Sequence, residues 1–107
     1  MGKLYRKARE HFGRNALERG YQEWMILNRP SESEKELQRE HHFVQEPLIS
    51  IVVPIYRTPE VFLREMIESV LNQTYGKLEL CLADGSGEDD TAGTVICEYV
   101  EKDPRVR

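Results

Sequence analysis

The chain has 107 residues, enough for one small domain. Its formal net charge of −4 argues against nucleic-acid binding, which needs a basic face to neutralise phosphates. There is no apolar run of membrane-spanning length, and no apolar stretch follows the first charged residues as in a secretory signal. Cys81 and Cys97 match neither a disulfide framework nor a zinc site. We expect a cytoplasmic protein with two buried thiols.

The charge is unevenly distributed along the chain. Residues 1–30 hold seven basic and three acidic residues, a net charge of +4, whereas residues 47–107 hold six basic and eleven acidic residues, a net charge of −5. This contrast predicts a helical extension over 1–46 and a separate domain over 47–107.

The extension has the spacing of helices. Apolar residues recur at helical intervals over 3–28, and Pro30 ends this helix. Ser31 and Glu34 form a capping-box pattern, which predicts a second, polar helix over 32–42.

The basic character of residues 1–30 leaves two interpretations open. With its aromatic residues, among them Phe12, Tyr21 and Trp24, the helix could lie on an anionic membrane surface. It could equally pack against the rest of the chain or against another copy.

From residue 47 onward, apolar β-branched runs alternate with helical patterns. In chain order we first expect a strand at 48–53 ended by Pro54, and then a helix whose start is capped by Thr58 with Pro59 at its first position. A strand at 78–83 and a helix from about 90 to 102 follow, and Val106 is expected to start a third strand. This order predicts parallel strands joined by right-handed crossovers, one half of a doubly wound α/β sheet. Ligands of such sheets bind outside the carboxyl ends of the strands.

Two segments lie at those ends. Tyr56 follows the first strand, where its ring could stack on a planar ligand or pack on the edge of the sheet. Asp84 ends the second strand, where its carboxylate could accept a ring N–H or ribose hydroxyls, or could cap its own turn. Ser86 could bond to backbone or to ligand.

Other patterns indicate less. An EF-hand loop counted from Asp84 fails, because Asp89 stands where glycine is required and Val95 where glutamate is required. The acidic run 88–90 is therefore expected to cap the following helix. There is no dinucleotide fingerprint and no P-loop, and His41 and His42 are expected to be surface or packing residues.

The second segment nevertheless resembles a known family. Residues 47–107, 61 of the 107, are similar to the start of an inverting family 2 glycosyltransferase with the GT-A fold. The pieces that carry the likeness are Ile49-Ser50-Ile51-Val52-Val53-Pro54-Ile55-Tyr56, Ser69-Val70-Leu71-Asn72-Gln73-Thr74-Tyr75, Glu79-Leu80-Cys81-Leu82-Ala83-Asp84-Gly85-Ser86, and Asp90-Thr91.

The resemblance implies the nucleotide-sugar-binding half of a Rossmann-like GT-A domain, with a β-α-β-α order and parallel strands. Tyr56 would stack on the base, Pro54 would offer backbone contacts, and Asp84 would accept the N3–H of a uracil or thymine, with Ser86 close by. A UDP- or dTDP-sugar is the donor that this implies.

The sequence departs from the family pattern at two positions. The family usually has two consecutive acids at the second strand end, and here Ala83 replaces the first. The usual asparagine after the tyrosine is Arg57, which could instead reach a phosphate.

The family's metal-binding Asp-x-Asp motif and catalytic base lie further along the chain than residue 107. The resemblance implies a divalent cation, Mg²⁺ or Mn²⁺, in a complete enzyme that transfers the sugar to an acceptor hydroxyl in surface polysaccharide or glycan synthesis. We expect this chain to be a fragment without catalytic or metal-binding residues, inactive alone, and prone to self-association through an exposed sheet edge. The alternative is a non-catalytic α/β module that binds a nucleotide or a protein.

Overall fold

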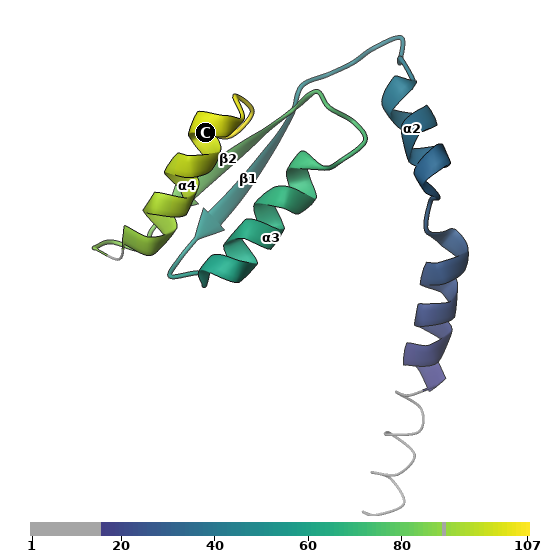
Figure 1. Ribbon diagram of the computed structural model, residues 1–107, viewed down its shortest axis with the longest axis horizontal. Coiled ribbons are helices and arrows are strands. Elements are labelled where there is room, and N and C mark those ends of the chain that lie inside the picture. The colour runs from purple at the N-terminus through teal and green to yellow at the C-terminus, as the bar shows by residue number, and fades with distance from the viewer. Residues whose placement is uncertain (1–15, 89) are drawn as a thin grey trace, which may run out of the picture. The chain divides into compact units, whose positions relative to one another are not determined.

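The structure, a computed structural model, describes residues 16–88 and 90–107 (Figure 1). The chain divides into two units, Met1–Glu34 and Lys35–Arg107. Residues 16–28 of the first unit are helical, as predicted, while the expected part at 3–15 lies outside the described residues. The boundary expected between residues 46 and 47 stays a prediction.

Helix α2, Glu32–Glu40, begins at the predicted capping box. The N–H of Glu34 donates to the Ser31 hydroxyl at 3.3 Å, and the N–H of Ser31 donates to the Glu34 carboxylate at 2.7 Å. The backbone bond from Ser31, and then the bond from its hydroxyl, lower the pKa of Glu34. The helix ends two residues before the predicted position 42, and no residue in it is buried.

The second unit is built on a two-stranded parallel sheet. Strand β1, Ile49–Ile55, is followed by helix α3, Glu60–Leu71, strand β2, Leu78–Asp84, and helix α4, Asp90–Lys102. This order confirms the predicted β-α-β-α architecture.

The end of the chain pairs with the other edge of β2. Val106 forms a parallel bridge with Leu80, the N–H of Leu80 donates to the Arg105 carbonyl at 2.7 Å, and the N–H of Arg107 donates to the Leu80 carbonyl at 2.8 Å. The expected start of a third strand at Val106 is therefore confirmed.

The core lies on one face of the sheet. Leu63 and Ile67 of α3 and Val95 of α4 are almost completely buried and pack with Ile55 and Leu80. Both helices thus cover the same face, as Figure 1 shows. The opposite face has no covering element among the described residues, and Val52 on it is 68% exposed.

Pro54 lies inside β1 and does not end it, which corrects the sequence-based expectation. The N–H of Ile49 donates to the Lys77 carbonyl, and the Ile55 carbonyl accepts from the N–H of Gly85, so odd-numbered residues of β1 direct their backbone groups toward β2. Pro54 is even-numbered, and its missing N–H points to the edge of β1 that has no partner strand among the described residues. Self-association through this edge stays a prediction.

Two further expectations were wrong. Pro59 is the N-cap of α3, and no side chain caps it, so the Thr58 hydroxyl does not have the predicted role. The first helical bond runs from the N–H of Leu63 to the Pro59 carbonyl at 3.0 Å, one residue beyond Thr58. Cys97 is exposed on α4 rather than buried, and Cys81 is half-buried.

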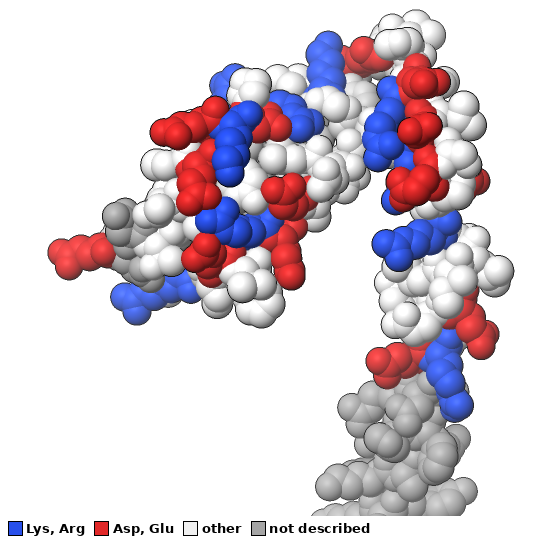
Figure 2. Space-filling model, in the orientation of Figure 1, with Lys and Arg blue, Asp and Glu red and all other residues white. Residues whose placement is uncertain are grey.

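Charged side chains of both signs are mixed over the outer surface of α3 and α4, as Figure 2 shows. Arg64 of α3 forms ion pairs with Glu60 and with Glu98 of α4, each at 2.9 Å. The Tyr99 hydroxyl donates to Glu68 at 2.8 Å, which also joins the two helices. No helix among the described residues is both long and apolar enough to cross a membrane.

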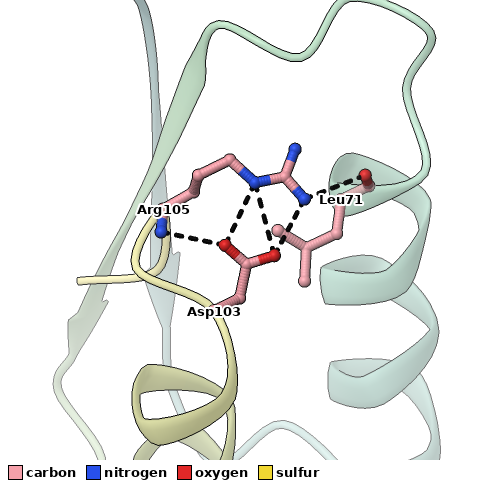
Figure 3. A network of polar contacts seen from close by, with 3 residues as sticks. All are labelled: Leu71, Asp103 and Arg105. Atoms are coloured by element: carbon pink, nitrogen blue, oxygen red, sulfur yellow. Dashed lines mark hydrogen bonds and ion pairs between the residues drawn. The ribbon is translucent and has the colours of Figure 1, made fainter.

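A polar network fixes the end of the chain to α3 (Figure 3). Arg105 donates to the Asp103 carboxylate at 2.8 Å. It also donates, at 3.3 Å, to the carbonyl of Leu71, which is the last residue of α3. Because the C-terminal carbonyls of a helix have no partners within it, Arg105 acts as a cap. Its hydrogen bonds hold the pKa of Asp103 below its usual value.

We expect Arg105→Ala to lower the free energy of unfolding by about 1 kcal/mol, because it removes charge-assisted bonds at a half-buried site. Urea unfolding followed by circular dichroism measures this. Since the folded-state pKa of Asp103 is depressed, the part of this contribution that comes from the Asp103 pair is present above about pH 4 and is lost as the pH falls through the folded value. The bond to the Leu71 carbonyl does not titrate and remains.

Arg107→Ala is the matched control, because its side chain is 70% exposed and forms an ion pair with Glu79 at 3.4 Å. Equal losses for the two variants, or a difference that does not shrink as the pH falls, would contradict the assigned role of Arg105.

Candidate functional site

The carboxyl ends of β1 and β2 lie side by side. The register pairs Ile55 with Asp84, so the residues that follow each strand leave the sheet at the same edge. The N–H of Gly85 donates to the Ile55 carbonyl at 2.8 Å, which extends the pairing one residue beyond β2. The two segments singled out from the sequence are thus brought together.

Ser86 joins these two segments. Its side chain is 4% exposed, and its hydroxyl accepts a bond from the N–H of Arg57 at 2.9 Å. Its own N–H donates to the Asp84 carboxylate at 2.9 Å. Ser86 therefore links the two loops through hydrogen bonds, and because it is buried, a bound ligand would contact little of its side chain.

Asp84 is exposed at the end of β2. The Ser86 hydroxyl, and after it the Ser86 N–H, lower the pKa of Asp84. The group is therefore an ionised acceptor at neutral pH, with one oxygen engaged in the turn. Asp84 caps its own turn, as one of the two interpretations of the sequence had it, and the exposure of its carboxylate leaves the ligand-binding interpretation open as well.

Tyr56 points away from the core. It is 68% exposed, and the guanidinium carbon of Arg57 lies 5.3 Å from its ring centre. This places a cation and an exposed aromatic ring next to each other, above the end of β1. Such a pair can meet a planar group and an anion at once.

Arg57 has a φ of 48°, in the left-handed region. This conformation disfavours residues with a Cβ by roughly 1–2 kcal/mol, and asparagine tolerates it better than arginine does. The bond from its N–H to Ser86 helps to hold it. No signal in the sequence alone reveals this backbone conformation.

Pro54 is the second-last residue of β1, two residues before Tyr56, and it is exposed. By the alternation of β1, its carbonyl points to the strand edge that has no partner among the described residues. It is thus free to accept a bond from a ligand.

The described residues do not fit a metal. No three His, Cys, Asp or Glu side chains among them are grouped to hold a cation. The predicted cap of α4 by residues 88–90 falls partly on Asp89, which lies outside the described part of the chain. His41 and His42 are exposed, as expected for surface residues.

An α/β half-sheet with polar and aromatic residues at the carboxyl ends of its strands is a ligand-binding architecture. The model of glycosyl transferase family 2 matches residues 50–107, and the chain belongs to this family.

Several curated proteins are similar to part of this chain. The chain is 52% identical over 61 residues to the uncharacterized protein y4gI of Sinorhizobium fredii, covering 57% of this chain and 7% of that protein. It is 41% identical over 61 residues to the chondroitin synthase of Escherichia coli, covering 57% of this chain and 9% of that protein.

A third relative, the O-antigen biosynthesis protein RfbC of Myxococcus xanthus, is 29% identical over 87 residues, 81% of this chain and 7% of that protein. The chain therefore spans less than a tenth of the length of these three relatives. No solved structure matches the chain.

Arg57→Asn should raise the free energy of unfolding by about 1 kcal/mol, because it relieves the left-handed strain of a longer side chain. Thermal and urea unfolding measure the change. Arg29→Asn, an exposed position without a positive φ, serves as the control and should change stability little. A loss of stability on Arg57→Asn would mean that the contact with the Tyr56 ring outweighs the backbone strain.

Proposed function

We propose that residues 47–107 bind the nucleotide of a nucleotide-sugar donor. The observation that carries this proposal is the convergence of Tyr56 and the ionised Asp84 at adjacent strand ends, held by the buried Ser86. Tyr56 stacks on the base, Asp84 accepts a base N–H, and the Pro54 carbonyl offers a further acceptor. Arg57 reaches the diphosphate, since guanidinium pairs well with phosphate oxygens.

The donor is a UDP- or dTDP-sugar, because a carboxylate acceptor matches the N3–H of uracil and thymine. In a complete glycosyltransferase the sugar passes to an acceptor hydroxyl in surface polysaccharide or glycan synthesis. The similarity to the chondroitin synthase of Escherichia coli and the O-antigen biosynthesis protein of Myxococcus xanthus supports a role in such synthesis. A divalent cation, Mg²⁺ or Mn²⁺, neutralises the departing diphosphate in such enzymes. No three His, Cys, Asp or Glu side chains among the described residues are grouped to hold it, and we expect this chain alone to be inactive.

Calorimetric titration of the chain with UDP, dTDP and GDP, with and without Mn²⁺, tests the donor site. We expect the two pyrimidine nucleotides to bind more tightly than GDP. Tyr56→Ala should weaken binding about tenfold or more through lost stacking, and Asp84→Asn should reduce the preference for pyrimidines.

Tyr21→Ala is the matched control, an exposed tyrosine in the other unit. Binding that is unaffected by both site variants would contradict the assignment. No binding by a folded chain would favour the alternative, a non-catalytic α/β module that binds a protein.

We also propose, second, that residues 1–30 contact an anionic membrane surface, with the excess of basic residues outside 16–28 and exposed apolar side chains within that range. Leu17, Tyr21 and Trp24 are each more than half exposed, and the rings of Tyr21 and Trp24 stack at 6.3 Å. With the excess of basic residues in 1–30, this is the composition of an interfacial helix.

Trp24 is the single tryptophan of the chain and reports on this contact. Vesicles with anionic lipid should shift its emission to shorter wavelength, and salt should weaken the effect by screening. Leu17→Glu should reduce binding, whereas Val61→Glu, the same change at an exposed position of the other unit, should not. A shift that is equal with neutral vesicles would argue against electrostatic attraction.

A further inference from the structure

A cavity of about 520 Å³ lies at the amino-terminal end of β1, the end opposite Tyr56 and Asp84. Much of its lining is apolar and comes from Phe43, Pro47, Ile49 and Tyr75, and His41 adds a further ring. Phe43 is 53% exposed and Ile49 is 46% exposed, so this apolar surface faces water. The seven residues of β1 separate the cavity from the donor site by about 20 Å.

The walls are held by specific contacts. The Tyr75 hydroxyl donates to the Pro47 carbonyl, and the Thr74 hydroxyl donates to the Gln38 side chain at 3.0 Å. The Phe43 ring meets His41 edge-on at 4.5 Å and Tyr75 at 6.1 Å. These contacts join the end of α2, the segment before β1 and the loop between α3 and β2, and so the cavity is formed before any ligand arrives.

Desolvation, and secondarily Glu46, raise the pKa of Tyr75. Its hydroxyl therefore stays protonated at neutral pH and continues to donate to Pro47. This wall of the cavity therefore keeps its hydrogen bond between Tyr75 and Pro47 throughout the physiological pH range.

A second cavity of about 170 Å³ shares Gln38, His41, Thr74 and Tyr75 with the first, so the two adjoin along a common wall. Its remaining lining is polar and mostly basic: Arg39, His42, Glu46, Gly76 and Lys77.

The charges of this smaller cavity favour an anion. The N–H of Phe43 donates to Glu46 at 3.3 Å, which partly compensates the Glu46 charge, and the His42 ring lies 3.5 Å from the same carboxylate. Arg39 and Lys77 form no ion pair with any described residue. Two cations are therefore available to a ligand.

We propose that the two cavities together bind one amphiphile, a single apolar chain with an anionic head group. The apolar chain lies among the rings of Phe43 and Tyr75, and the head group lies against Arg39 and Lys77. The larger cavity has the size and the mainly apolar lining of a small-molecule site. The unpaired cations next to it supply the charge complementarity that selects an acidic head group.

Octyl phosphate and octyl glucoside, which share one apolar chain, test this site. Both are titrated below their micelle concentrations into the isotopically labelled full chain, followed by NMR. We expect saturable shifts from octyl phosphate at residues 38–49 and 74–77, binding of octyl glucoside at least tenfold weaker, and no saturable shift from inorganic phosphate. Equal affinity for the two amphiphiles, or shifts confined to residues 16–28, would overturn the proposal.

Variants separate the two parts of the site. Arg39→Gln with Lys77→Gln should lower the affinity for octyl phosphate about tenfold and leave that for octyl glucoside unchanged, whereas Phe43→Ala should lower both. Lys102→Gln, an exposed cation of α4, is the control and should change neither. Retained spectral dispersion shows that each variant is folded, and an unchanged affinity of the double variant would refute the role of the cations.

Discussion

The parallel pairing of β1 with β2 is the constraint on which the candidate donor site depends. Its register sets Ile55 opposite Asp84, and every residue proposed to meet the nucleotide follows from that match. A slip of one residue would exchange the faces of the strand that slips and turn its core residue, Ile55 of β1 or Leu80 of β2, toward water. Burial of these side chains against α3 and α4 therefore fixes the register, and the register in turn positions Tyr56 and Asp84.

The fold could be predicted from the sequence because its signals are local and agree with one another. The apolar runs, the helical spacing and the polar segments after each strand all favour one β-α-β-α order, and even the pairing of Val106 follows from it. The placement of Tyr56 and Asp84 at one edge could be predicted as well, since parallel strands carry their carboxyl ends to the same side.

What could not be predicted depends on backbone direction and tertiary contacts. Whether Pro54 ends a strand depends on which edge its nitrogen faces. That in turn depends on whether the even- or the odd-numbered residues of β1 bond to β2. The left-handed conformation of Arg57 has no signal in an arginine, because the bond from its N–H to Ser86 joins residues 29 apart. Ser86 likewise has the composition of an ordinary turn residue, and only the structure shows that it is buried and links the two loops.

The one-sided sheet also explains why the two ends of β1 differ. At the carboxyl end, Gly85 bonds to the last residue of β1 and Ser86 bonds to the segment that follows it, so polar groups pair with one another and Tyr56 is the exposed ring. At the amino end, the chain enters β1 from a segment whose apolar side chains have no helix to pack against within the described residues, and they gather around Tyr75 instead. A surface with unburied rings costs free energy in water, and a bound apolar chain would recover part of it. The same half-sheet thus carries the polar candidate site at one end and the apolar candidate site at the other.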